Sequence, residues 1–220
     1  MDPREDEKRA AAEAAAGEVS DGMAVGLGTG STVAHFLPSL AARGLADLRC
    51  VATSEATESQ ARVVGLPVQP FDLLDRLDIA VDGADQVSPD LWLVKGGGGA
   101  HGREKVVAAA AERFVVIVSS DKLVPAIEPP VPLEVLSFGF AATLRQLRAL
   151  GPVEVRDAPP TADGNTLVDY RGEVTDPAAL AGALDAIPGV IHHGLFPPEV
   201  VDVVLVGRPG GSVDRVPTLR

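Results

Sequence analysis

The segment Lys95–Ala100 carries the clearest chemical signal in the sequence, because a lysine there is followed by four consecutive glycines. Four glycines cost backbone entropy that a simple connection does not require, so another group is expected to approach this backbone closely. The Lys95 ammonium and the backbone N–H groups of Gly96, Gly97 and Gly98 could together hold an oxyanion. A flexible linker is the alternative interpretation of the run.

Two aspartates follow an apolar segment. Leu77–Val81 has the composition of a short buried strand, and Asp82-Gly83-Ala84-Asp85 comes directly after it. This order places both acids at the carboxyl edge of a sheet, where α/β proteins bind ligands. Their carboxylates could bind hydroxyls, a hard cation or nearby backbone amides, the last as in an ordinary Asx-turn. A metal is not expected, because no histidine or cysteine lies near them in the sequence.

Glu104 lies in the sequence Arg103-Glu104-Lys105, at the start of the helix that is expected after the glycine run. A carboxylate that faces the glycine loop could act as a general base. An ordinary solvated helix start, whose acidic side chain favours the helix dipole, explains the same three residues.

The turn Gly28-Thr29-Gly30-Ser31-Thr32 lies between an apolar run and a predicted helix. Its backbone N–H groups and hydroxyls could hold an anion such as a phosphate. The turn has neither the lysine of a P-loop nor the third glycine of a dinucleotide-binding fingerprint. A tight turn with an ordinary helix cap accounts for it equally well.

Alternating strands and helices are needed to bring these segments to one edge of a sheet. Short apolar runs alternate with helix-forming segments up to about residue 120, which predicts a Rossmann-like α/β domain with a mostly parallel sheet and helices on both faces. The expected strands are 23–27, 48–52, 77–81, 91–94 and 114–118, and the expected helices are 4–16, 31–44, 55–64 and 103–113. Pro38 falls inside the second helix, where it should kink or break the chain.

The pattern changes after Pro129-Pro130, the predicted linker. From there the expected order is β-α-β-β-α-β, typical of the ferredoxin-like α+β arrangement. Its strands are expected at 133–138, 153–156, 166–170 and 190–196, and its helices at 141–150 and 177–187. A last strand at 202–206 could return to the first sheet. We therefore expect an α/β catalytic domain of residues 1–130 and 200–220 and a smaller α+β domain of residues 131–199.

Composition limits the partners and the compartment. The 31 acidic and 19 basic residues give a net charge of −12, which opposes binding to nucleic acid. The single Cys50 allows no intrachain disulfide, and His101, His192 and His193 have no metal-ligand spacing. A charged, Ala-rich N-terminus and the lack of about 18 consecutive apolar residues argue against secretion or a membrane span. We expect a cytoplasmic protein without nucleic-acid or membrane partners.

Together, these segments resemble the ribose-5-phosphate isomerase type A family over nearly the whole chain. The matching motifs are GLGTGST at 26–32, DGAD at 82–85, KGGGGA and REK within 95–105, PLEV at 132–135, DGN at 163–165, and PGV and GLF within 188–196. The resemblance implies that ribose 5-phosphate and ribulose 5-phosphate are interconverted without a cofactor or metal, in the non-oxidative pentose phosphate pathway. It also implies a homodimer or a homotetramer.

The resemblance further implies roles for individual residues. Glu104 matches the catalytic acid/base, and Asp82 and Lys95 match polar residues that act beside the sugar. The implied substrate-binding positions are Thr29, Gly30, Ser31, Thr32, Asp82, Gly83, Ala84, Asp85, Lys95, Gly96, Gly97, Gly98 and Lys122. The sequence departs from the family pattern at Ser119 and Gln86, where an acid is usual, and at Asp121, where a serine is usual.

The residues leave two alternatives open. Another phosphorylated aldose could be the substrate, because the reacting ends of aldose phosphates are alike. A sugar-phosphate sensor that keeps the binding loops without turnover is the alternative that is not an enzyme.

Overall fold

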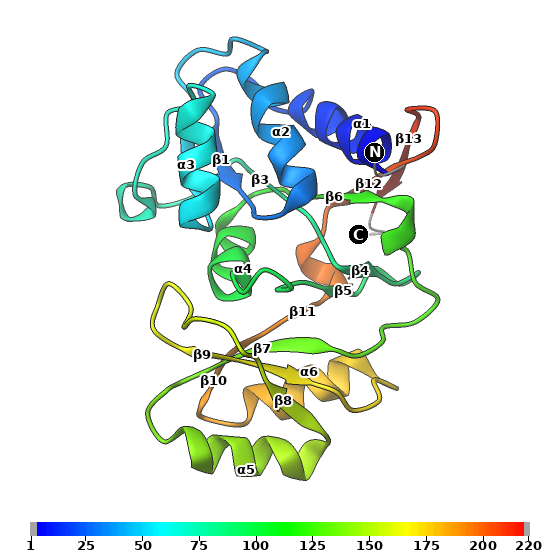
Figure 1. Ribbon diagram of the computed structural model, residues 1–220. Coiled ribbons are helices and arrows are strands. Elements are labelled where there is room, and N and C mark those ends of the chain that lie inside the picture. The colour runs from blue at the N-terminus through cyan, green and yellow to red at the C-terminus, as the bar shows by residue number, and fades with distance from the viewer. Residues whose placement is uncertain (1–3, 218–220) are drawn as a thin grey trace. The chain divides into compact units, whose positions relative to one another are not determined.

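The computed structural model describes residues 4–217. The chain divides into two compact units, each with its own sheet and helices (Figure 1). The first unit contains the residues up to Ala84, Arg103–Lys122 and the residues from Glu199 onward, and the second contains Asp85–Gly102 and Leu123–Pro198. The outermost residues of the larger predicted domain, 1–3 and 218–220, lie outside the described part.

The first unit is built on a six-stranded sheet with the strand order β13-β12-β6-β3-β1-β2. Its strands are β1 (Ala24–Leu27), β2 (Arg49–Ala52), β3 (Ile79–Asp82), β6 (Phe114–Ser119), β12 (Val203–Gly207) and β13 (Val213–Pro217). All neighbouring pairs are parallel except β12 and β13. Every residue of β1, β3, β6 and β12 is buried, because helices cover both faces of the sheet. The predicted mostly parallel sheet is therefore confirmed.

The helices of this unit differ in the side chains that they bury, and α1 packs through small ones. They are α1 (Glu5–Ala16), α2 (Ser31–Ala41), α3 (Glu55–Val63) and α4 (His101–Ala110), with short 3-10 turns η1 (Phe71–Leu73), η2 (Ser120–Lys122) and η3 (Pro198–Val200). The first two residues of α4 group with the second unit. In Figure 1, α1 lies beside α2, and it contacts β6 and β12. The face of α1 that makes these contacts is a stripe of fully buried alanines, so the helix lies close to the sheet.

Pro38 does not end its helix. α2 continues through Pro38 to Ala41, and the Ala42 N–H donates to the Pro38 carbonyl over 2.9 Å. The side chains of Leu37 and Leu40 on either side of it are almost completely buried. Burial of this apolar face holds the last turn in helical form despite the missing hydrogen bond.

The second unit contains the predicted β-α-β-β-α-β arrangement, but the strand expected at 190–196 is divided, and only its first part belongs to this sheet. Its elements are β7 (Val131–Val135), α5 (Phe140–Leu150), β8 (Val153–Val155), β9 (Thr166–Tyr170), α6 (Pro177–Asp185) and β10 (Val190–His193). The strands form an antiparallel sheet in the order β10-β7-β9-β8. Apolar residues from this sheet, α5 and α6 make a separate core.

A small antiparallel sheet changes the expected division of the chain. It consists of β4 (Gln86–Val87), β5 (Leu93–Val94) and β11 (Leu195–Phe196), in the order β11-β5-β4. The predicted strand at 91–94 is thus shorter and does not belong to the parallel sheet. Because β5 pairs with β11, residues 85–102 group with the second unit, together with 123–130. Both segments therefore lie outside the larger domain, to which their sequence had suggested they belong.

Cys50 provides a test of the buried position of β2. Its side chain is fully buried, and burial raises the pKa of the thiol to about 11. Because the thiolate is the reactive form of cysteine, we expect the folded protein to react with Ellman's reagent at mildly alkaline pH only as fast as it unfolds. The labelling of Cys50 is followed by absorbance. Its rate in buffer is compared with the rate of unfolding, and its rate in denaturant gives the reactivity of the exposed thiol. Rapid labelling of a protein with an intact circular dichroism spectrum would contradict this position.

Candidate active site

The first unit gathers polar groups at the carboxyl edge of its sheet. β1, β3 and β6 are parallel neighbours, so their carboxyl ends meet at one edge. β1 leads into the turn that begins at Gly28, β3 ends with Asp82, and β6 ends with Ser119. Asp82, which the sequence analysis placed just after the strand, is its last residue and is buried, with 3% of its surface exposed.

Gly28 and Asp82 are in very close contact. The Gly28 N–H donates to the Val81 carbonyl over 2.9 Å, and the Thr29 N–H donates to Asp82 Oδ1 over 3.0 Å. Asp82 Oδ1 also accepts the Gly83 N–H over 2.7 Å. A Cβ atom at residue 28 would lie only 2.0 Å from the Asp82 carboxyl carbon. Glycine is therefore required at position 28, and two charge-assisted hydrogen bonds orient the carboxylate.

The turn leads directly into α2. Gly30 is the N-cap residue and has a φ of 128°, a conformation that favours glycine. α2 then begins at Ser31 and has no acidic residue in its first turn. A helix N-terminus presents backbone N–H groups and a partial positive charge, so this turn is suited to hold an anion.

Glu104 lies in the first turn of α4 and is buried, with 4% of its surface exposed. The ordinary solvated helix start that the sequence also allowed is therefore wrong. Further along α4, the Val107 side chain packs against Gly26 of β1, where a Cβ atom would lie 2.5 Å from Val107 Cγ1. The glycine lets α4 lie close to β1, which anchors the helix that carries Glu104.

Lys122 ends the 3-10 turn after β6, and its side chain is about one-third exposed (35%). The turn is held by Glu7 of α1, whose Oε2 accepts the Ser120 N–H over 2.7 Å. Asp121 Oδ1 accepts the Ser119 hydroxyl over 2.5 Å. Compared with the family pattern, the serine and the acid are interchanged between positions 119 and 121. In this chain the two side chains form a hydrogen bond with each other.

The surroundings of Asp121 favour its charged form. Burial raises the pKa of this carboxyl, but the hydrogen bond from Ser119 and the positive charges of Lys122 and Arg4 outweigh that effect and leave the pKa below its ordinary value. Arg4 Nη1 lies 2.8 Å from Asp121 Oδ2, and Lys122 Nζ lies 3.9 Å from it. The Ser119 hydrogen bond and the Arg4 ion pair together hold Asp121, the residue directly before Lys122.

The second unit contains Lys95, the glycine run and Asp85. Lys95 is 3% exposed, and its Nζ lies 5.6 Å from the centre of the Phe196 ring, within range of a cation–π interaction. Its backbone N–H donates to the Gly194 carbonyl over 2.8 Å. The Gly97 N–H donates to Asp85 Oδ2 over 2.8 Å. Asp85 thus holds the loop that follows the lysine.

Arg156 is a residue of this loop region that the sequence analysis missed. Its Nη1 donates to the carbonyls of Gly96 and Gly97 over 3.0 and 3.2 Å. Its guanidinium also forms two hydrogen bonds with the Asp169 carboxylate, over 3.0 and 2.7 Å. These contacts rule out a flexible linker. No local pattern could have identified Arg156, because it is about 60 residues from the loop in sequence.

The glycines of the run are also required by close packing. A Cβ atom at Gly96 would lie 2.6 Å from Nδ1 of the buried His101, and one at Gly97 would lie 3.0 Å from the Asp85 carboxylate oxygens. Gly96 and Gly99 have φ values of 98° and 78°. The sequence predicted that another group approaches this backbone closely, and the side chains of His101 and Asp85 do so.

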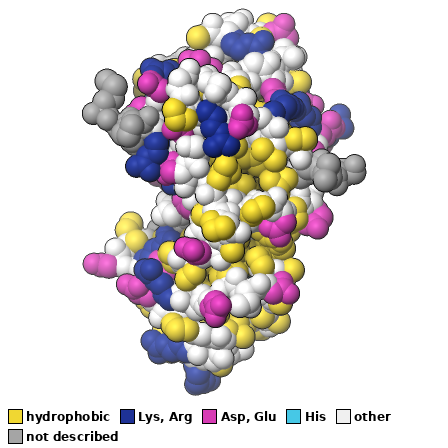
Figure 2. All heavy atoms as spheres, turned by 90° about the vertical axis from the view of Figure 1, so that its right-hand side faces the viewer, with side chains coloured by type: hydrophobic (Ala, Val, Ile, Leu, Met, Phe, Trp, Pro, Cys, Tyr) yellow, Lys and Arg dark blue, Asp and Glu magenta, His cyan; other side chains and the backbone are white. Residues whose placement is uncertain are grey.

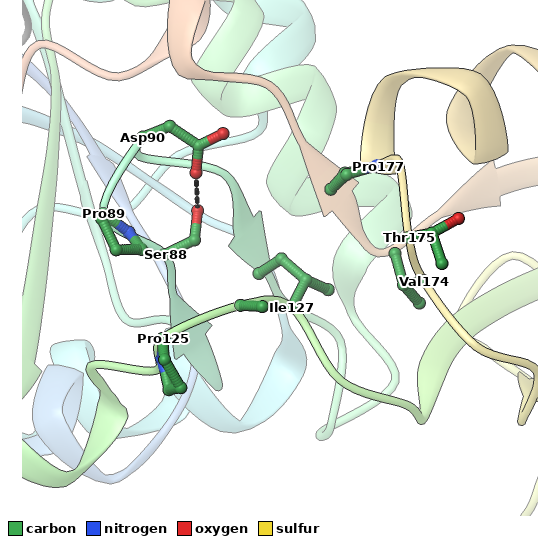
Figure 3. A pocket seen from close by; sticks show the side chains of 9 residues that line it. Ser88, Pro89, Asp90, Pro125, Ile127, Val174, Thr175 and Pro177 are labelled. Carbon is green, nitrogen blue, oxygen red and sulfur yellow. Dashed lines mark hydrogen bonds between the residues drawn. The ribbon is translucent and has the colours of Figure 1, made fainter.

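A pocket of about 350 Å³ lies elsewhere in the second unit (Figure 3). It is lined by Ser88, Pro89, Asp90, Pro125, Ala126, Ile127, Val174, Thr175 and Pro177. In Figure 3 the Ser88 hydroxyl points to the Asp90 carboxylate, and the two oxygens are 2.5 Å apart. None of the residues predicted for the site lines this pocket.

Residues 4–217 contain neither a cluster of metal ligands nor a membrane-spanning helix. No three histidine, cysteine or acidic side chains come together there as ligands for a metal ion. No helix in the same range has the length and hydropathy needed to cross a bilayer.

Comparison with known proteins indicates one family. The model of ribose 5-phosphate isomerase A (phosphoriboisomerase A) matches residues 49–211. A ribose-5-phosphate isomerase A from Caulobacter vibrioides is 46% identical over 225 residues, covering 97% of this chain and 99% of that protein. The structure of ribose 5-phosphate isomerase A from Neisseria gonorrhoeae aligns with a TM-score of 0.93 at 32% identity, over 99% of this chain and 98% of that one. A D-ribose-5-phosphate isomerase in complex with phospho-erythronic acid aligns with a TM-score of 0.89 at 36% identity, over 96% and 97% of the two chains.

The contact between Gly28 and Asp82 predicts a specific destabilisation. We expect Gly28→Ala to lower the free energy of unfolding by about 1–3 kcal/mol, because the new Cβ atom displaces the Asp82 side chain. Adding Asp82→Gly should recover part of this loss, since the clashing atoms are removed. Urea unfolding of the two single variants and the double variant measures the coupling.

Gly182→Ala is the matched control for this experiment. A Cβ atom at this position in α6 has no neighbour within 4 Å, so the variant should be as stable as the parent protein or slightly more stable. Equal stability of Gly28→Ala and Gly182→Ala would show that the turn does not lie against Asp82.

Proposed function

The chain belongs to the ribose 5-phosphate isomerase A family and interconverts ribose 5-phosphate and ribulose 5-phosphate, and on that premise we propose which of its residues carry out the reaction. The alternative of a sensor without turnover is set aside, because the relatives are named as isomerases. The reaction moves the carbonyl from C1 to C2. It requires loss of a proton from C2, a cis-enediolate intermediate and gain of a proton at C1.

Glu104 is proposed as the base that moves this proton. One carboxylate on one face of the sugar can take the proton from C2 and return it to C1, so a single residue serves both steps. The observation that carries the proposal is the burial of Glu104 in the first turn of α4. A glutamate is rarely buried without a structural or chemical reason.

Lys95 is proposed to stabilise the oxyanion of the enediolate. Its ammonium is buried beside the Phe196 ring, and low exposure strengthens its attraction for a negative charge. Asp82 would assist ring opening or move protons between O1 and O2, and its orientation is fixed by two backbone N–H groups. Asp85 would orient the sugar hydroxyls with the oxygen that the Gly97 N–H does not occupy.

The phosphorylated substrate needs local positive charge, because the net charge of −12 repels it. Acidic and basic side chains are interspersed on the face shown in Figure 2, so the overall surface supplies no strong attraction there. We propose that the turn at 28–32, the N–H groups of Gly96–Gly98 and the ammonium of Lys122 bind the substrate. Phospho-erythronic acid, bound in a similar structure, combines a phosphate, hydroxyls and a carboxylate that resembles the enediolate oxygens.

The remaining expectations are also proposals. The reaction transfers protons within one molecule and needs no external electron acceptor, so we propose that it proceeds without a metal or cofactor. We further propose a cytoplasmic homodimer or homotetramer, which rests on the family resemblance.

Replacing Glu104 tests the central assignment. We expect Glu104→Gln to lower kcat by about 10²- to 10⁴-fold with little change in KM, because the amide fills the same space and cannot accept the proton. A coupled assay with ribose 5-phosphate measures both constants. Exchange of solvent deuterium into the C1 position of the product should be lost in parallel.

Glu112→Gln is the matched control. Glu112 lies just after α4 and is exposed, in an ion pair with Arg76. The variant should keep kcat within about twofold of the parent value, since exposed ion pairs contribute little. If Glu104→Gln kept the same activity as Glu112→Gln, another residue would have to be the base.

Chelation tests the proposal that no metal takes part. We expect activity on ribose 5-phosphate to be the same before and after dialysis against EDTA. Loss of activity that added magnesium or zinc restores would overturn this part of the proposal.

A further inference from the structure

Four hydroxyl groups form a chain beside the turn after β1. Thr53 and Ser54 lie between β2 and α3, Thr57 lies in the first turn of α3, and the fourth hydroxyl is that of Thr29. Thr29 Oγ1 lies 2.8 Å from Thr53 Oγ1 and donates to Ser54 Oγ over 2.9 Å. Ser54 Oγ lies 3.0 Å from Thr57 Oγ1. Thr57 Oγ1 lies 2.8 Å from the Gly28 carbonyl oxygen.

Counting protons fixes the direction of this chain. Each hydroxyl has one proton, and a carbonyl oxygen can only accept, so the Thr57 proton goes to Gly28. Ser54 then donates to Thr57, and Thr29 donates to Ser54. With the Thr29 proton on Ser54, the Thr53 proton is available to Thr29 Oγ1, 2.8 Å away, or to the Leu27 carbonyl, 3.2 Å away. Every proton has one acceptor, and a chain with one direction strengthens each of its bonds.

The chain ends on the peptide unit that also contacts Asp82. The carbonyl of this unit is that of Gly28, which accepts from Thr57, and its N–H is that of Thr29, which donates to Asp82 Oδ1. The Gly28–Thr29 peptide is thus held from both sides. Its orientation decides where the next N–H groups of the turn point and how the Asp82 carboxylate lies.

Helix capping alone does not explain this arrangement. Ser54 is the N-cap residue of α3, and capping needs only the hydrogen bond from the Thr57 N–H to Ser54 Oγ, which is 3.1 Å long. The hydroxyls of Thr29 and Thr57 add nothing to the cap. Thr53 and Thr57 are nevertheless buried, with 1% and 4% of their surfaces exposed, and the chain ends outside the helix.

We propose that Thr53, Ser54 and Thr57 are positioning residues of the isomerase, which act through the Gly28–Thr29 peptide on the substrate-binding turn. The inference rests on the proposed role of the turn at 28–32 in binding the substrate. Thr29 acts within the chain, because its proton is committed to Ser54, and it contributes to the turn through its backbone.

Substitution of Thr57 tests the proposal. Thr57→Val keeps the shape of the side chain and removes its hydroxyl, so the Gly28 carbonyl loses its donor. We expect KM for ribose 5-phosphate to rise about tenfold, with kcat within about twofold, as for a buried carbonyl left without its hydrogen bond. The inhibition constant of inorganic phosphate should rise with KM. Thr57→Ser retains the hydroxyl and should restore both constants.

Thr143→Val separates positioning from a general loss of stability. Thr143 is a buried threonine of α5, outside the proposed machinery. Removal of the Thr143 hydroxyl should lower the melting temperature of the protein and leave KM for ribose 5-phosphate unchanged. The proposal is overturned if Thr57→Val leaves KM unchanged, if Thr57→Ser raises KM as much as Thr57→Val, or if Thr143→Val raises KM as well.

Ser31→Ala distinguishes the positioning role of the hydroxyl chain from the substrate-binding role of the turn. Ser31 belongs to the turn itself, at the start of α2. A higher KM in Ser31→Ala with no change in Thr57→Val overturns the positioning chain and supports the role of the turn. No change in either variant overturns both the chain and the proposed role of the turn.

Discussion

The contact between Gly28 and Asp82 is the constraint on which the polar edge of the first unit depends. With no side chain at residue 28, the backbone after β1 comes close enough for the Thr29 N–H to reach the Asp82 carboxylate. The same approach places Gly30 and the first turn of α2 beside the end of β3. A side chain at this one position would separate the carboxylate from the turn, so a packing requirement determines where the charged and hydrogen-bonding groups lie.

The glycine run of the second unit follows the same principle with different partners. Backbone that lacks side chains can accept hydrogen bonds from Arg156 and donate one to Asp85. The entropy that four glycines lose on ordering is offset by these bonds, which are strong because each involves a charged group. Each loop is therefore ordered by contacts within its own unit.

Much of the architecture could be predicted from local sequence. Predominantly apolar runs at 23–27, 77–81 and 114–118 predicted the parallel sheet, because strands buried on both faces have no regular polar alternation. The run at 91–94 looked the same and belongs to an antiparallel sheet, since a short apolar run does not specify its partner. Pro38 was expected to break α2, but burial of the neighbouring leucines keeps the helix intact.

Six motifs in a specific order were enough to indicate the family and to suggest which residues take part in the reaction. The tertiary structure decided what surrounds those groups. Only packing showed that Glu104 is buried rather than solvated, that Arg156 holds the glycine run, and that a chain of hydroxyls ends on Gly28. The physical reason is that periodicity and turn chemistry act over a few residues, whereas burial and hydrogen bonding join segments about 30 to 60 residues apart, whose contacts exist only after the chain has folded.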